Sequence, residues 1–250
     1  MSTTKIRHAA AAAMIFGSIS VPAFAQDAPG GEIKMLVGDQ AVSWHTGTDG
    51  TTSWTEDGYS FSGADSGDGW MIQWDILSSG SDIRSMLIQY TIINTGSSTQ
   101  NFQISMTDAL GASFNAGTLT GGSIAGTFTD LNGDGVGISA RDDASIYSAF
   151  LDRTDSSAGT VVGTLLDDAS ATASSFFSGT FANESFGNVP QVPGHEGPAA
   201  LESFGVLLDF ELTAGDTAGF TGTMAVAAPT PGALALLGIA GMRQRRRRSA

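Results

Sequence analysis

The residues best suited to chemistry lie in one acidic, glycine-rich loop, Asp130-Leu131-Asn132-Gly133-Asp134-Gly135. Oxygen-bearing side chains occupy its first, third and fifth positions, and glycine occupies the sixth, as in the first half of a calcium-binding loop. Calcium prefers several hard oxygen ligands, and this spacing brings three of them to one point. The candidate ligands are Asp130, Asn132 and Asp134.

The second half of this loop does not match the calcium pattern. Its twelfth position, where a bidentate carboxylate is expected, is Arg141, and Asp142 and Asp143 follow one residue late. No helix is expected on either side. A plain Asn-Gly and Asp-Gly turn between two strands is therefore favoured. Calcium is the alternative, and no other cofactor is indicated.

Two other groups of residues invite a binding role. The segment 65–69 is also acidic and glycine-rich, and a solvated turn explains it well. Five aromatic residues gather in the first third of the chain, where they can stack on sugars or fill a core. Trp70, Ile72 and Trp74 would share one strand face, which favours the core for these two tryptophans. The five aromatics are Trp44, Trp54, Tyr59, Trp70 and Trp74.

Catalysis has little support in the sequence. Outside the first 25 residues the histidines are His45 and His195, and neither belongs to a metalloprotease or nucleophile-elbow motif. The chain has no cysteine, which excludes disulfides and thiol chemistry. We expect a protein that is not an enzyme.

Charge restricts the partners of the central region, residues 26–228. It holds all 25 acidic residues but only four basic ones, a net charge of −21. Such a surface repels phosphate backbones, so nucleic-acid binding is not expected. The four basic residues are Lys34, Arg84, Arg141 and Arg153.

The central region is predicted to be all-β, an antiparallel and jelly-roll-like sandwich. Residues 102–107 alternate apolar and polar side chains, and with the apolar segment 84–93 they are expected to form a hairpin across a turn at 94–98. The segments 204–212 and 220–226, separated by the turn Ala214-Gly215-Asp216, form a second alternating pair. Short strands separated by Gly- and Asp-rich turns are typical of a sandwich. Further strands are expected at 42–46, 59–62, 70–77, 123–129, 136–140, 146–151 and 160–166.

Two segments are less regular. One short helix competes with a strand near 144–152. The segment 183–200, which contains three prolines and three glycines among its residues, is predicted to be a long surface excursion.

The first 25 residues are typical of a secretory signal peptide with a signal helix. Lys5 and Arg7 precede an apolar stretch, and Ala23-Phe24-Ala25 then supplies the small-x-small pattern that signal peptidase recognises. The apolar stretch is too short for a lasting anchor. We expect cleavage after Ala25 and a mature chain that begins at Gln26.

The last 22 residues, 229–250, have three parts in order. A stiff proline segment precedes an apolar helix, Ala233–Met242, of marginal length for a membrane span. A basic cluster then follows that should stay cytoplasmic. The proline segment is Pro229, Thr230, Pro231 and Gly232, and the cluster is Arg243, Arg245, Arg246, Arg247 and Arg248.

This order resembles the PEP-CTERM sorting signal, although Thr230 replaces the usual glutamate. The resemblance implies processing by an exosortase, a membrane-embedded cysteine protease, and an association with exopolysaccharide-producing bacteria. The N-terminal signal predicts export by Sec, and the resemblance implies a temporary anchor in the inner membrane and release to the cell surface or exterior.

The leading hypothesis is an exported, non-enzymatic protein of the cell surface or extracellular matrix, with signal peptidase, an exosortase-like protease and exopolysaccharide as partners. A calcium-assisted carbohydrate-binding module and a secreted hydrolase are the alternatives. The chain thus divides into a signal peptide (1–25), a sandwich domain (26–228) and a sorting tail (229–250).

The processing hypothesis predicts the mass of the exported protein. We expect both the signal and the arginine cluster to be absent, because each lies beyond a cleavage segment. Intact-mass measurement of surface-released protein tests this. A mass that still includes residues 243–250 would contradict the sorting hypothesis, and Pro231→Ala with Gly232→Ala should leave the protein uncut in the inner membrane.

Overall fold

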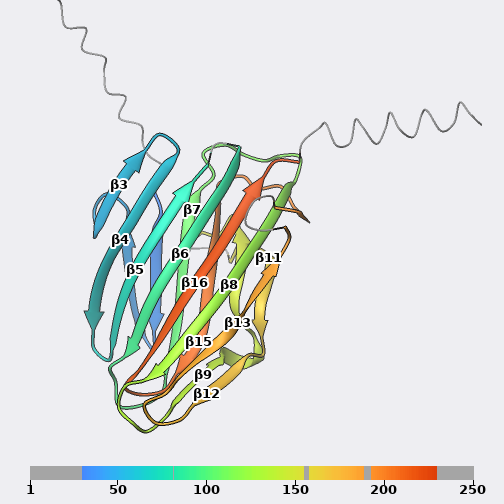
Figure 1. The fold of residues 1–250 in the computed structure, drawn as a ribbon. Helices are drawn as coiled ribbons and strands as arrows, with labels where there is room; N and C mark the ends of the chain where they lie inside the picture. Colours follow the sequence, from blue (N-terminus) through green and yellow to red (C-terminus); the bar gives the residue numbers. More distant parts are fainter. Residues whose placement is uncertain (1–29, 81, 155–157, 189–192, 230–250) are drawn as a thin grey trace, which may run out of the picture.

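The computed structural model describes residues 30–80, 82–154, 158–188 and 193–229, which form an all-β protein of two antiparallel sheets. Eight strands belong to each sheet, and Figure 1 shows the sheets as two layers. Sheet A runs in the order β11 (Thr160–Asp167), β10 (Ser145–Leu151), β15 (Ser203–Leu212), β7 (Gln100–Ala109), β1 (Glu32–Val37), β2 (Gln40–His45), with β9 (Val136–Ala140) beside β15 and β12 (Ser170–Ala173) beside β9. Sheet B runs in the order β13 (Ser178–Phe186), β8 (Thr118–Asp130), β16 (Asp216–Ala227), β6 (Ile83–Asn94), β5 (Trp70–Ser79), β4 (Gly58–Gly67), β3 (Thr51–Thr55), with β14 (His195–Gly197) beside β8.

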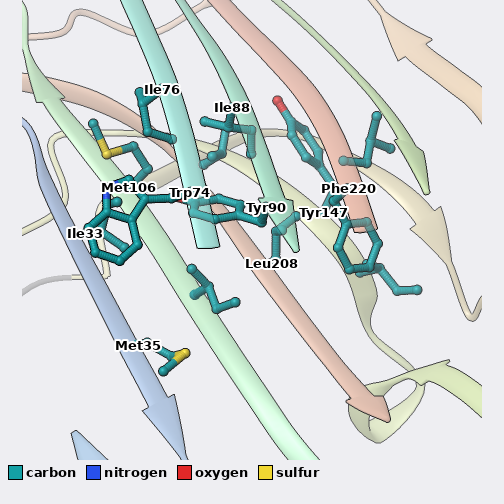
Figure 2. Close-up of a cluster of buried hydrophobic side chains, with 14 of the residues drawn as sticks. Ile33, Met35, Trp74, Ile76, Ile88, Tyr90, Met106, Tyr147, Leu208 and Phe220 are labelled. Carbon is teal, nitrogen blue, oxygen red and sulfur yellow. The ribbon is translucent and has the colours of Figure 1, made fainter. Parts of the chain in front are cut away.

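The predicted alternation places one face of each central strand in a shared core. The apolar residues at even positions of 102–106 and 204–212 are completely buried. Figure 2 shows Met106 and Leu208 of sheet A in one buried cluster with Trp74 and Ile88 of sheet B. The rings of Phe210 and Phe220 face each other between the sheets, with centroids 5.0 Å apart. Burial of this apolar surface is what favours the layered arrangement.

Most of the aromatic group from the first third of the chain belongs to this core. Trp44, Trp70 and Trp74 are buried, and Tyr59 is buried beside them. The rings of Trp44 on sheet A and Trp74 on sheet B lie 4.9 Å apart. Trp54 is half exposed on the edge strand β3. The prediction of core positions for Trp70 and Trp74 is confirmed.

The predicted hairpin of residues 84–93 with residues 102–107 is wrong in its pairing. β6 lies in sheet B and β7 in sheet A, so the turn at 94–98 crosses between the layers. The same holds for β15 in sheet A and β16 in sheet B. Both strands of each pair bury one apolar face, and they do so from opposite sides of the core rather than side by side.

The remaining predicted strand segments are confirmed, and the predicted short helix is wrong. Each further strand segment overlaps an observed strand, and residues 145–151 form β10 rather than a helix, because their buried side chains pack in sheet A. The described helical residues are the short 3-10 turn η1 (Arg141–Asp143). The prediction of a surface excursion at 183–200 is wrong at two places, because residues 183–186 belong to β13 and residues 195–197 form β14, and both strands pair with β8. The signal segment and the tail from Thr230 onward lie outside the described residues.

A buried asparagine joins the two crossings between the sheets. Asn94, which is fully buried at the end of β6, donates from its amide to the carbonyl oxygens of Ser98, Leu212 and Thr213 at 2.9, 2.8 and 3.1 Å. The Gly215 amide donates in turn to the Asn94 carbonyl at 2.8 Å. The Asn94 side chain therefore links the turn between β6 and β7 to the turn between β15 and β16.

Replacing Asn94 by alanine should destabilise the whole domain. The change removes the donor from three carbonyl groups, and we expect a loss of about 3 kcal/mol in the free energy of unfolding. For a domain of this size that corresponds to a fall of roughly 6–12 °C in Tm.

Asn101→Ala is the matched control, because Asn101 is exposed on β7. It should change the free energy of unfolding by less than about 0.5 kcal/mol. Equal melting curves for the two variants would show that Asn94 does not hold the crossings together.

Candidate metal site

Two aspartates face each other across the central strands of sheet B. Asp130 ends β8 and Asp216 begins β16, and they are direct partners in the antiparallel register. Both continue the inward-facing phase of their strands, which includes Phe128 on β8 and Ala218 and Phe220 on β16. The relative exposure of Asp130 is 3% and that of Asp216 is 0%. Like charges in direct opposition destabilise a sheet, so this pair needs compensation.

The Asp130 carboxylate organises the predicted loop. Its Oδ1 accepts hydrogen bonds from the amides of Asn132 and Gly133, and its Oδ2 accepts from Gly135 and Phe176, at distances of 2.5–3.2 Å. Burial acts to raise the pKa of Asp130, but these four backbone donors outweigh it and hold the pKa below its usual range. The folded state therefore favours the ionised form of Asp130.

A third carboxylate completes the group. One carboxylate oxygen from each of Asp130, Asp134 and Asp216 lies within 4.8 Å of the others. Two ligands of one calcium ion lie at most about 5.2 Å apart, given bonds of roughly 2.3–2.6 Å. None of the ion pairs among the described residues involves these three side chains. The oxygens thus have the chemistry and spacing of a hard-cation site.

Asp216 is the least compensated member of the group. Its Oδ2 accepts the hydroxyl of Thr213, whereas its buried Oδ1 has no hydrogen-bond partner. Burial raises the pKa of Asp216, the Thr213 hydroxyl and the Leu131 backbone amide act to lower it, and the charges of Asp130 and Asp134 raise it further. A buried carboxylate oxygen without a donor is costly, and a bound cation would remove that cost.

Two of the three predicted ligands come together in the structure, and the third has a different role. Asp130 and Asp134 come together, while the Asn132 amide donates to the Ala214 carbonyl at 2.9 Å and its oxygen accepts the Asp134 amide at 3.0 Å. Asn132 therefore connects the loop to the turn before β16. Calcium binding by these residues stays a prediction.

Sequence reasoning missed Asp216, which lies 86 positions after Asp130. The signal that could have found it is parity, since residue 216 is in phase with the buried residues Phe220, Met224 and Val226. The expected twelfth position offers no replacement. Arg141 instead pairs with Asp142 at 3.2 Å and with Asp209 at 3.6 Å.

The other predicted polar positions form separate surface groups. Asp65 accepts the indole N–H of Trp44 at 2.9 Å, and the turn at Asp68-Gly69 joins β4 to β5. His45 and His195 lie on strands of different sheets, so the structure does not bring the two histidines together.

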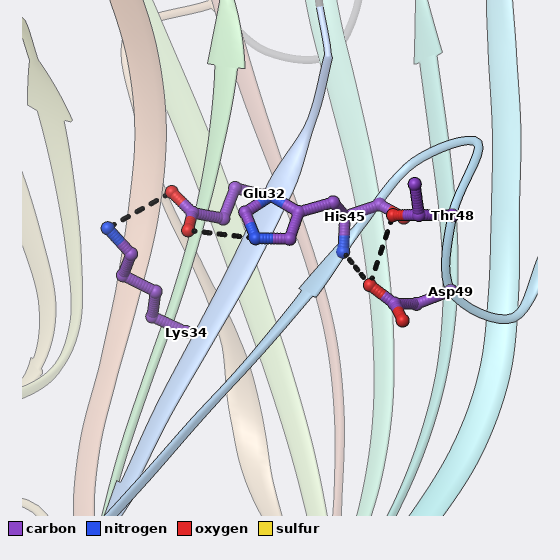
Figure 3. Close-up of polar contacts among 5 residues, drawn as sticks. All are labelled: Glu32, Lys34, His45, Thr48 and Asp49. Carbon is purple, nitrogen blue, oxygen red and sulfur yellow. Dashed lines mark hydrogen bonds and ion pairs between the residues drawn. The ribbon is translucent and has the colours of Figure 1, made fainter.

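The environment of His45 is a network on β1 and β2 (Figure 3). Glu32 contacts the Lys34 ammonium at 3.1 Å and His45 Nε2 at 3.6 Å, and Asp49 accepts the His45 amide at 2.8 Å and the Thr48 hydroxyl at 3.2 Å. Beside it lies an open hollow of about 600 Å³, lined by residues that include Lys34, Ser43, Gln103 and Arg153.

Comparison with protein-family models gives no match, and comparison with curated proteins gives none either. Among the described residues no helix combines the length and apolar character needed to cross a membrane.

The raised pKa of Asp216 predicts a pH effect in calcium-free buffer. Because folding raises this pKa, the contribution of Asp216 to stability is fully present below the unfolded-state pKa of about 3.9 and is lost as the pH rises through the folded-state pKa. Asp216→Asn removes the charge, so at neutral pH it should melt above the wild type. This difference should shrink as the pH falls. Melting curves with chelator across pH test it, and a difference that does not vary with pH would contradict it.

Proposed function

We propose that this chain is an exported, non-enzymatic protein of the cell surface or extracellular matrix whose sandwich domain binds calcium at one end. The observation that carries the proposal is the buried Asp216 Oδ1, which lacks a hydrogen-bond partner and lies in a group with the carboxylates of Asp130 and Asp134. The ligands would be Asp130, Asp134 and Asp216.

Three features support an exterior location for such a site. The signal-like segment 1–25 and the PEP-CTERM-like segment 229–250 point to export and exosortase processing. The central net charge of −21 is compatible with a solvated surface. A domain without disulfides also gains from a metal that ties separate segments together.

The proposed site joins parts of the chain that are far apart in sequence. Asp130 and Asp134 belong to the loop after β8, and Asp216 begins β16. A cation bound by all three would hold this end of sheet B closed. The finer description of the sandwich as jelly-roll-like is part of the proposal, and it is supported by the crossings between sheets after β6, β7 and β15.

Calcium should therefore raise the melting temperature. A ligand that binds the folded state alone stabilises it by about 2.7 kcal/mol at a hundredfold excess over Kd, or roughly 5–11 °C for a domain of this size. The measurement compares Tm in calcium chloride and in chelator. Asp134→Asn should reduce the increment, because it removes one negative charge from the site, and it should not disturb the fold, because Asp134 is exposed.

Asp68→Asn provides the matched control. Asp68 is likewise an exposed aspartate before a glycine of positive φ, with Gly69 at 83° and Gly135 at 96°. It should keep the full increment. Identical melting curves with calcium and with chelator would remove the proposed site, as would an unchanged increment in Asp134→Asn.

A further inference from the structure

The most exposed aromatic side chains of the described residues lie on the turn between β12 and β13. Phe176 is 72% exposed and Phe177 is 67% exposed. The turn is closed by a hydrogen bond of 2.9 Å from the Phe177 amide to the Ser174 carbonyl. Two adjacent phenylalanines in water contribute little to the folded core, so their presence calls for another explanation.

The backbone conformation of this turn is also unusual for a phenylalanine. Phe176 occupies the third position of the turn with a φ of +62°, a conformation that favours glycine or asparagine. A bulky aromatic residue there costs stability in its backbone, and at 72% exposure it gains little from burial. Such outliers concentrate at binding sites.

The turn is attached directly to the carboxylate group. The Phe176 amide donates to Asp130 Oδ2 at 2.5 Å, and the Asp130 amide donates to the Phe177 carbonyl at 3.1 Å. The Phe176 ring also lies against Gly133, where an added Cβ would come within 2.3 Å of the ring. The position of the aromatic pair therefore depends on the same side chain that would hold the cation.

We propose that the Phe176–Phe177 turn and the ion at Asp130, Asp134 and Asp216 together bind a neutral polysaccharide. The inference rests on the proposed calcium site. Aromatic rings pack on the apolar face of a sugar, and calcium, which takes roughly six to eight oxygen ligands, accepts sugar hydroxyls in positions that three carboxylates leave open. Leu131 adds exposed apolar surface on the loop that carries Gly133.

Charge favours a neutral glycan over a lipid surface as the partner of this turn. The basic residues within the described ranges are Lys34, Arg84, Arg141 and Arg153, and none of them lies in the loops 130–135 or 174–177. Docking to a lipid surface uses basic residues that attract anionic headgroups, and the net charge of −21 repels such a surface. A neutral polysaccharide meets neither difficulty.

The test is affinity electrophoresis of the central domain in gels that contain a soluble β-glucan, α-glucan or galactomannan, with calcium or with chelator. We expect retardation by at least one polysaccharide in calcium, and loss of it with chelator. The double variant Phe176→Gly, Phe177→Ser should weaken the interaction about tenfold or more, while the calcium increment in Tm is retained. Glycine suits the positive φ of position 176, so this variant should fold at least as well.

Trp54→Ala is the control, because Trp54 is the exposed tryptophan on the distant edge strand β3. It should leave the retardation unchanged. A retardation that depends on Trp54 and not on Phe176 and Phe177 would overturn the proposal, and so would retardation that persists in chelator.

Two further measurements separate the competing partners. Sedimentation with phosphatidylserine vesicles that depends on the two phenylalanines, without any retardation by polysaccharide, would assign the turn to a lipid surface. Self-association that depends on them would assign it to a second copy of this chain, and either result overturns the proposal. A calcium increment in Tm without retardation would defeat this inference alone, whereas no increment would defeat the calcium site as well.

Discussion

The pairing of β16 with β8 and β6 is the constraint on which the candidate site depends. β16 pairs from Asp216 to Ala227 with β8 on one side, and almost as far with β6 on the other. Since side chains alternate strictly along a strand, the inward phase that buries Phe220 and Met224 also turns Asp216 inward. A shift of one residue would expose the apolar side chains, so the opposition of Asp130 and Asp216 is a consequence of core burial.

A second buried carboxylate, Asp108, is compensated by groups of the protein itself. Asp108 on β7 accepts hydrogen bonds from the Ser78 hydroxyl and the Ala109 amide, and although burial raises the pKa of Asp108, these bonds and the nearby Arg84 charge oppose the rise. Asp216 accepts the Thr213 hydroxyl but has two anionic neighbours, Asp130 and Asp134, and no cationic one among the influences on its pKa. This contrast is the physical reason why calcium is proposed at Asp216 and not at Asp108.

Alternation allowed the strands to be predicted from sequence, and it fixed which face of each strand is buried. It could not reveal which strands pair, because 84–93 and 102–107 have the same pattern whether they lie side by side or on opposite layers. The contacts of Asn94 with Leu212 and Thr213 span more than a hundred residues and leave no local signal. Likewise the spacing of Asp130 and Asp134 was visible in the loop, whereas Asp216 joins them only through the register of two distant strands.

The direction of β16 has a mechanical consequence. This strand of 12 residues begins at the carboxylate group and ends two residues before Pro229, the first residue of the predicted sorting segment. At about 3.3 Å per residue, the two ends of β16 lie about 36 Å apart. In a protein held through its C-terminal side, any pull on a ligand at the far tip would travel lengthwise along this one strand. Its hydrogen bonds to β8 and β6 lie perpendicular to that pull, so the ladders would resist it in shear, together rather than one after another.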